Sequence, residues 1–476
     1  MAKVVHDMFY WLGQINKASM VMHARDGILT SEQAVRFAKG LERVLDKGNQ
    51  EGAARPGLYI TFEPLMIKEA TDEITLIHAG RSSQDMLATC RFAILRENIL
   101  ALAEAITKTE ELLLEKAAQH QGTIMPSYTN GVAAQPNSYG HYLLAVAEGF
   151  ARDSERLRQY YVRLNRCPMG TTVLNGTSWP LDRDKMADYL GFDAISYNAF
   201  DANQIYSFEY GVEAGYLVTS LALRIGNFIE DVMQQYAQPR PWIILQEGGA
   251  NTFVSSAMPQ KRNPGILNKT RAAASTLLGS AVGAVFRSHN IPAGMPDARS
   301  TELNKMVQDG KAMVDNFSKI LQALVINPER ALEELNLDWT ASQEVADVLM
   351  RKYKIPFRIG HHVASEIVSY ARKNGFTPMS FPYEQVQRIY KEVVAGHEHV
   401  PAELPMSPAE FKATLDPVAI VNNRATKGGP QPVEMAKMLI DYRGRWMEEC
   451  VWCREKKQKI AGAENTLNDA FAKLLK

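Results

Sequence analysis

The chain of 476 residues is 46% hydrophobic and 22% charged, a balance typical of a globular protein with a large core. Its lysines and arginines number 53, as do its aspartates and glutamates, so no excess positive charge favours nucleic acid or an anionic membrane as a partner. The N-terminus lacks an apolar signal core, no run approaches the length of a membrane span, and four cysteines are too few for a disulfide scaffold. We therefore expect a cytoplasmic protein that binds neither membrane nor nucleic acid.

Helical periodicity dominates the sequence. An amphipathic helix is predicted over 32–45, with Ser31 as its N-cap. Longer runs with apolar residues at helical spacing follow at 91–119, 137–164, 208–236, 264–287 and 303–324. These runs of roughly 22–30 residues would measure about 33–45 Å at 1.5 Å per residue. Helices of this length usually pack side by side, so we predict an all-α fold with an elongated central bundle.

Three domains are predicted from this pattern: a helical N-terminal domain over 1–85, the bundle over 86–327, and a C-terminal domain over 328–476. The C-terminal domain is expected to hold shorter helices, because prolines interrupt it near 376–378 and 401–405. Cys450 and Cys453 have the spacing of a redox or zinc pair. They lie in a charged, helix-like segment without a second pair, so we interpret them as structural.

The segment 254–264, Val-Ser-Ser-Ala-Met-Pro-Gln-Lys-Arg-Asn-Pro, is the most informative stretch of the chain. Gly248 and Gly249 precede it, which favours a mobile loop. Pro264 fits the first turn of the following helix and so puts Lys261 and Asn263 at a helix N-terminus, where an anion such as a carboxylate is held well. The pattern is that of a site that takes a proton beside a carboxylate. The alternative interpretation is a surface loop that ends in an ordinary Pro-initiated helix.

Three blocks resemble those of the aspartase/fumarase superfamily, most of all its argininosuccinate lyase branch. They are Gly-Arg-Ser-Ser-Gln-Asp at 80–85, Met-Pro-Ser-Tyr-Thr-Asn at 125–130 followed by Gln135-Pro136, and the segment 255–264. They occur in the family order, and the likeness covers most of the chain. The resemblance implies three mostly helical domains whose central helices form a 20-helix core in a homotetramer, with active sites built from blocks of three different chains.

The resemblance also implies a lyase that forms fumarate by β-elimination, with fumarate and an amine as its small-molecule partners. A base removes a proton next to a carboxylate, the carbanion spreads into that carboxylate as an aci-form, and the leaving group departs. This chemistry needs a base, a cationic or dipolar clamp and an acid for the leaving group. We expect no cofactor and no metal ion, because the ten histidines are scattered without zinc-site spacing.

Each block matches family residues with a role. Ser256 matches the general base, Lys261 and Asn263 match the residues that hold the carboxylate, and Thr129 and Ser82 match hydroxyl contacts to the fumarate part. The remaining candidate substrate contacts of these blocks are Arg81, Ser83, Gln84, Ser255 and Met258. Arg81 is interpreted equally as a carboxylate clamp or as a structural ion-pair partner. His141 lies on an apolar helix and is interpreted as a structural histidine.

The departures from the branch concern the leaving-group side. Asn130 stands where the branch has a histidine, and Asn268 where it has the glutamate that partners this histidine. Because both charged groups are replaced by amides, no partner is left stranded. We predict that Asn130 and Asn268, from different subunits, line one pocket. The branch's tyrosine and glutamine for the arginine moiety are also absent. Arg299 is a candidate for a second substrate carboxylate, and its alternative is a solvent-facing arginine.

The sequence therefore predicts a lyase that releases fumarate from an N-substituted aspartate other than argininosuccinate, with a succinyl-diamine such as ethylenediaminedisuccinate as one option. Argininosuccinate lyase proper is one alternative. Another is a non-catalytic, crystallin-like homologue that keeps the fold. Loss of the charged pair favours such a homologue, whereas retention of Ser256, Lys261, Asn263 and Thr129 counts against it.

Overall fold

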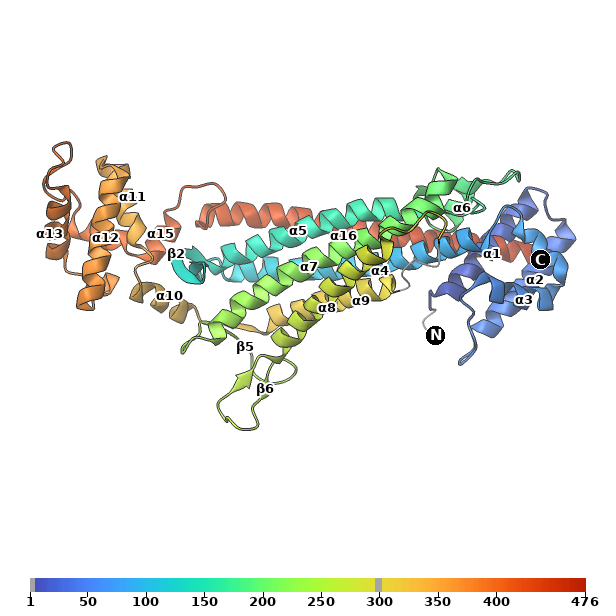
Figure 1. Ribbon diagram of the computed structural model, residues 1–476, viewed down its shortest axis with the longest axis horizontal. Coiled ribbons are helices and arrows are strands. Elements are labelled where there is room, and N and C mark those ends of the chain that lie inside the picture. The colour runs from blue at the N-terminus through green and yellow to red at the C-terminus, as the bar shows by residue number, and fades with distance from the viewer. Residues whose placement is uncertain (1–4, 296–301) are drawn as a thin grey trace.

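The computed structural model describes residues 5–295 and 302–476 and is an elongated, mostly helical molecule (Figure 1). One end holds three helices and a 3₁₀ turn: α1 (Met8–Arg25), α2 (Ser31–Gly48), α3 (Tyr59–Ala70) and η1 (Asp72–His78). The middle is a bundle of α4 (Ser83–Gln119), α5 (Tyr139–Leu164), α7 (Tyr206–Tyr236), α8 (Gly265–Ser288) and α9 (Leu303–Ala323). The all-α prediction with a long central bundle is confirmed.

The bundle helices pack against one another through one hydrophobic core. The most extensive contacts are those of α7 with α8, α4 with α5, and α4 with α9. Apolar side chains at helical spacing fill the space between them, among them Ile99, Ile106, Leu143, Leu221 and Phe317. The same core continues into α1–α3, so the N-terminal helices and the bundle share buried apolar surface.

Capping residues set two helix starts differently from the prediction. The N-cap of α2 is Thr30 rather than Ser31, because the Thr30 hydroxyl accepts a hydrogen bond from the Gln33 amide at 3.2 Å and the Gln33 side chain accepts one from the Thr30 amide at 3.0 Å. α4 begins at Ser83 rather than at 91, through a second capping box that involves Ser82 and Asp85.

The far end is built from α10 (Pro328–Leu337), α11 (Ser342–Tyr353), α12 (Phe357–Asn374), η4 (Pro378–Ser380), α13 (Tyr383–Val394), α14 (Pro408–Thr414) and α15 (Pro417–Asn422). A separate hydrophobic cluster, which includes Trp339, Leu349 and Tyr390, holds α11–α14 together. The 43-residue helix α16 (Pro432–Leu474) then returns along α4 and α5 to reach α1 (Figure 1). The expectation of only shorter helices after 328 is therefore wrong for this segment, and the domain boundaries at 85/86 and 327/328 stay predictions.

Short sheets connect the helices. β1 (Ile124–Thr129) and β2 (Val132–Ser138) form an antiparallel hairpin, which is why α5 begins at Tyr139 rather than at 137. Within the predicted loop 254–264, the ends pair as β6 (Phe253–Val254) and β7 (Arg262–Asn263), and α8 starts at Gly265, after Pro264. The remaining short elements are β3 (Arg166–Cys167), α6 (Arg183–Tyr189), β4 (Ala194–Ile195), η2 (Asp201–Ile205), β5 (Ile243–Leu245) and β8 (Leu324–Ile326). Among the described helices, none has an apolar stretch long enough to cross a membrane.

Candidate active site

The three blocks that were singled out in the sequence lie at different places on one chain (Figure 1). The first block, 80–85, leads into the N-terminus of α4, whereas the second, 125–130, follows the C-terminus of the same helix. α4 has 37 residues, which corresponds to about 55 Å at 1.5 Å per residue. The third block, 255–264, is the loop between β6 and β7, which stands out from the bundle beside the start of α8. One chain therefore does not bring the first and second blocks together.

The first block presents a hydroxyl at a helix N-terminus. The Ser82 hydroxyl accepts a hydrogen bond from the Gln84 amide at 3.3 Å, and this leaves its own proton free to be donated. The Asp85 carboxylate accepts from the amides of Ser82 at 2.9 Å and Thr172 at 3.0 Å. Burial raises the pKa of Asp85 to about 6, against the lowering effect of these amides. The start of α4, with the half-buried Ser82, Ser83 and Gln84, is thus fixed in place by a capping box.

Arg81 is 4% exposed and is held by neutral groups. Its guanidinium donates to Asn16, Ser19 and Tyr59, each at 3.0 Å, and none of the described carboxylates forms a salt bridge with it. Arg81 thus forms no direct salt bridge with a described carboxylate, although its charge opposes the rise in the pKa of Asp85. The positive charge of Arg81 also acts on His23. Burial, and secondly the charge of Arg81, lower the pKa of His23 to about 4. Together with the positive end of α4, Arg81 makes this region attractive to an anion.

The second block forms a tight hairpin tip. Thr129 pairs with Val132, and Asn130 and Gly131 between them have φ values of +53° and +77°. Two residues with positive φ make a type I′ turn, for which Asn-Gly is the preferred sequence. Thr129 and Asn130 are both exposed. The backbone conformation of the turn is therefore sufficient to explain an asparagine at position 130, without any contact to a substrate.

His141 follows this hairpin and has partners for both ring nitrogens. Nδ1 lies 3.0 Å from the Asn137 side-chain oxygen, and Nε2 lies 3.0 Å from the Gly428 carbonyl. The second contact ties the start of α5 to the segment that leads into α16. These two contacts agree with the interpretation of His141 as a structural histidine.

The two serines of the third block differ in their surroundings. The Ser255 hydroxyl accepts hydrogen bonds from the amides of Ala257 at 3.3 Å and Met258 at 3.2 Å, and so shapes the turn of the loop. Ser256 is exposed, and its hydroxyl makes no hydrogen bond to another described residue. Lys261 and Met258 are exposed on the same loop. The hydroxyl that is available for chemistry is therefore the one predicted to be the base.

The loop is held at its base by residues on both strands. The Asn263 side-chain amide donates to the Phe253 carbonyl at 3.1 Å, so in this arrangement Asn263 braces the hairpin with the group that was predicted to hold a carboxylate. Arg262, which the sequence reasoning missed, pairs with Glu247 at 2.9 Å and donates to the carbonyls of Pro259 at 2.8 Å and Lys261 at 3.3 Å. Its only sequence signal was its place between two predicted site residues.

The remaining predicted residues are placed as follows. Asn268 is exposed on the first turn of α8, about one turn beyond the loop. Arg299 lies outside the described residues. Near the start of α8 the structure thus gathers Ser255, Ser256, Met258, Lys261, Asn263 and Asn268, while Arg81 and Ser82–Gln84 lie at the far end of α4 and Thr129–Asn130 at the β1–β2 turn.

Comparisons with known proteins bear on these blocks. Residues 59–279 match the family model described as lyase, and residues 339–422 match the model of the argininosuccinate lyase C-terminal region. The chain is 28% identical to argininosuccinate lyase 1 of Shouchella clausii, over 98% of this chain and 93% of that protein. Its fold is similar to that of EDDS lyase crystallised with formate, with a TM-score of 0.90 and 27% identity over 98% of this chain and 92% of that one. An EDDS lyase variant with bound fumarate gives the same TM-score and coverage at 26% identity.

Proposed function

Because the chain belongs to the argininosuccinate lyase-like branch of the aspartase/fumarase superfamily and is a carbon–nitrogen lyase that releases fumarate, we propose that its substrate is an N-substituted aspartate other than argininosuccinate. The observation that carries the assignment of its base is the difference between the two loop serines. Ser255 is engaged by two amides, whereas Ser256 is exposed beside Lys261 with its hydroxyl unengaged among the described residues.

In the proposed reaction, the Ser256 oxygen takes the proton from the carbon next to the substrate's carboxylate. The electron pair left on that carbon moves into the carboxylate and then forms the double bond of fumarate as the carbon–nitrogen bond breaks. The departing nitrogen leaves with that bond's electron pair and takes up a proton. A serine hydroxyl is a weak base, so its alkoxide needs stabilisation from Lys261 and from the positive end of α8 in a closed, water-poor site.

The carboxylates of the substrate need donors that one chain does not gather around Ser256. We propose that the first and second blocks are supplied by other copies of the chain in a homotetramer. The outward face of α8 supports this, because it carries Ala272, Gly279, Val282 and Phe286, of which Val282 is 54% and Phe286 73% exposed. An exposed apolar stripe on a long bundle helix marks a contact with another protein surface. Arg81 and the start of α4 would then serve as the anion clamp.

The proposal for the amine part of the substrate rests on the histidine of the branch that is absent at position 130 of this chain. A histidine at position 130 could protonate a leaving amine, and an asparagine cannot. A leaving group that needs less help, such as one end of a diamine, fits this site better than the guanidinium of arginine. The similarity to EDDS lyase supports a succinyl-diamine such as ethylenediaminedisuccinate. Fumarate plus the free amine are the proposed small-molecule partners, and the cytoplasm is the proposed compartment.

The test follows the loss of fumarate through the ultraviolet absorbance of its double bond, with a panel of diamines, amino acids and arginine. We expect a diamine to consume fumarate, and Ser256→Ala to lower kcat by about 10²–10⁴, the usual effect of removing a general base. Ser31→Ala is the matched control, because Ser31 is an exposed serine at the start of α2, outside the three blocks and outside α8. Turnover with arginine alone would make the chain an argininosuccinate lyase. No turnover with any amine from a folded protein would favour the crystallin-like alternative.

A further inference from the structure

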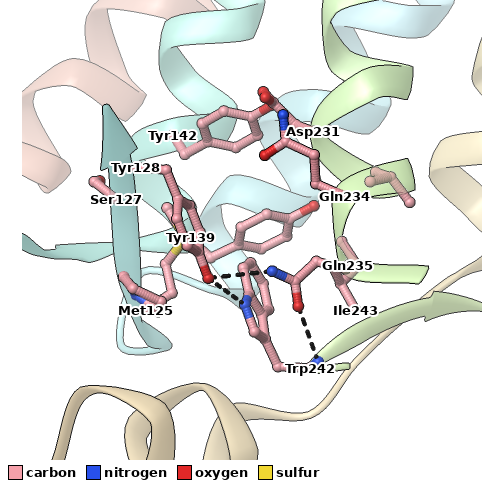
Figure 2. A pocket seen from close by; sticks show the side chains of 12 residues that line it. Met125, Ser127, Tyr128, Tyr139, Tyr142, Asp231, Gln234, Gln235, Trp242 and Ile243 are labelled. Atoms are coloured by element: carbon pink, nitrogen blue, oxygen red, sulfur yellow. Dashed lines mark hydrogen bonds between the residues drawn. The ribbon is translucent and has the colours of Figure 1, made fainter. Parts of the chain in front are cut away.

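A cavity of about 150 Å³ lies between the β1–β2 hairpin, α5, the end of α7 and β5 (Figure 2). Residues 125–128 of the second block line it, whereas Thr129, Asn130 and the residues of the first and third blocks do not. Its wall consists of Met125, Pro126, Ser127, Tyr128, Tyr139, Tyr142, Asp231, Val232, Gln234, Gln235, Trp242 and Ile243. A cavity of this volume is large enough for a small organic molecule.

Four aromatic rings make up much of the wall. The rings of Tyr139 and Tyr142 are stacked with centroids 5.7 Å apart, and Trp242 meets Tyr139 edge-on at 5.7 Å. The Tyr128 hydroxyl is fixed by hydrogen bonds from Gln235 at 3.1 Å and from the Trp242 indole at 3.4 Å. The rings are therefore held in place before any ligand arrives. Ring faces carry negative charge density, which attracts a cation.

The only charged side chain in the wall is a carboxylate, Asp231. Asp231 is an exposed residue, and its carboxylate accepts a hydrogen bond from the Tyr142 hydroxyl at 2.6 Å. None of the described lysines, arginines or histidines forms a salt bridge with it. Partial burial raises the pKa of Asp231, the hydrogen bond from Tyr142 lowers it, and the negative charge of Glu230 raises it further. The net result is a raised pKa for Asp231. A cation in the cavity would give this carboxylate the partner that the chain itself does not provide.

A second polar group of the wall is also without a partner. The Tyr139 side chain is 2% exposed, and its hydroxyl has no hydrogen-bond partner among the described residues. Figure 2 shows this hydroxyl directed across the cavity toward Gln234 and Gln235. A buried hydroxyl without a partner costs free energy, and an N–H donor in the cavity would remove that cost. The wall thus combines aromatic faces, one carboxylate and one free acceptor.

We propose that this cavity binds a small organic ammonium ion, such as a short alkylammonium, at a site separate from the one around Ser256. The alkyl part contacts the aromatic and aliphatic wall, and the ammonium group faces Asp231 and the Tyr139 hydroxyl. Tyr128 is the neighbour of Thr129 in β1, so the occupied cavity would also stiffen the hairpin that carries the second block.

The test is calorimetric titration of the full chain with propylammonium chloride, without fumarate, against propan-1-ol and sodium chloride at equal ionic strength. We expect saturable binding of propylammonium, and binding about tenfold or more weaker in Asp231→Asn and in Tyr139→Phe, because each loses a direct contact to the cation. Glu209→Gln is the matched control, since Glu209 is exposed in the first turn of the same helix α7 and does not line the cavity.

The same titration can refute the proposal in three ways. If propan-1-ol binds as tightly as propylammonium, the cavity binds small apolar molecules without a preference for a cation. Unchanged binding in a folded Asp231→Asn protein, with thermal unfolding as the check, would place the cation elsewhere. No saturable binding to the wild type would leave the cavity without this ligand. Because no step of the reaction at Ser256 is measured, none of these outcomes depends on the proposed function.

Discussion

The buried carboxyl of Glu110 gives a prediction whose size can be worked out from its surroundings. Glu110 lies in the middle of α4 and is 3% exposed. One of its oxygens is 3.5 Å from the Ser154 hydroxyl, and the other has no partner among the described residues. Burial, and secondly the negative charge of Glu449, raise the pKa of Glu110 to about 8 from a usual value of 4.5. The folded protein therefore holds a proton here that the unfolded chain releases in neutral solution.

The sign and the size follow from proton linkage. Because the folded state binds the proton more tightly, the free energy of unfolding is highest below a pH of about 4.5 and falls as the pH rises toward about 8. With about 1.36 kcal/mol for each pKa unit, this group alone lowers the stability by about 2.5 kcal/mol between about pH 5 and about pH 7. Glu110→Gln has the same shape as the neutral acid and does not titrate, so it should remove this loss.

The assay is urea or thermal unfolding of wild type and Glu110→Gln across this pH range. We expect the two proteins to have similar stability at about pH 5, and the variant to be more stable by roughly 2–3 kcal/mol at about pH 7. Glu111→Gln is the control, because Glu111 is the exposed neighbour on the same helix. A difference between Glu110→Gln and wild type that stays constant over the pH range would show that Glu110 is already ionised when folded, and would refute the reasoning.

Two further predictions concern the site. Arg262→Gln removes the pairing with Glu247 and the bonds to two loop carbonyls, so the loop should be misplaced and kcat/KM should fall by about tenfold or more, while the unfolding temperature stays the same. The control is Arg271→Gln, because Arg271 is exposed on α8. Equal kcat/KM in both variants would contradict a role for Arg262 in holding the loop. Asn130→Ala should lower the free energy of unfolding by about 1 kcal/mol, because a φ of +53° is unfavourable for alanine. Asn130→Gly should leave the free energy of unfolding almost unchanged. Urea unfolding measures both variants, and an equal loss of stability in the two would argue against strain at the turn.

The sequence was a good guide to the fold where periodicity is strong and long. The bundle helices α5, α7, α8 and α9 lie within two residues of their predicted ends, because their apolar residues repeat over many turns. The start of α4 was missed: its first three residues are polar and are fixed by a capping box, and the buried Met86, Leu87 and Cys90 that follow were not counted as part of the helix. The length of α16 was missed as well: this helix buries few residues completely, among them Met435, Cys453 and Leu467, and most of its apolar contacts with the core are made by partly buried side chains.

The candidate site shows where sequence reasoning reaches its limit. Residue types could identify the three blocks, but they could not distinguish Ser255, which is engaged by amides, from an unengaged Ser256, because this difference arises from the turn of the loop. Nor could they reveal that Arg81 is held by neutral groups or that Arg262 braces the loop. These are contacts between segments far apart in sequence or across a turn, and no local pattern encodes them.

Asn130 is the residue whose interpretation depends most on the structure. Its replacement of the branch's histidine, together with Asn268, pointed to a rebuilt leaving-group side. The hairpin adds a second cause, because Asn-Gly is the sequence that a two-residue turn with positive φ at both positions prefers. The two explanations differ in what they predict for position 268. If the leaving-group pocket has been rebuilt, an amide is needed at position 268 to meet Asn130. If Asn130 is present only because the turn needs it, the residue at position 268, on the exposed first turn of α8, is not constrained. The paired change at Asn268 therefore remains the stronger argument for a different leaving group, and Asn130 taken alone is explained by its backbone.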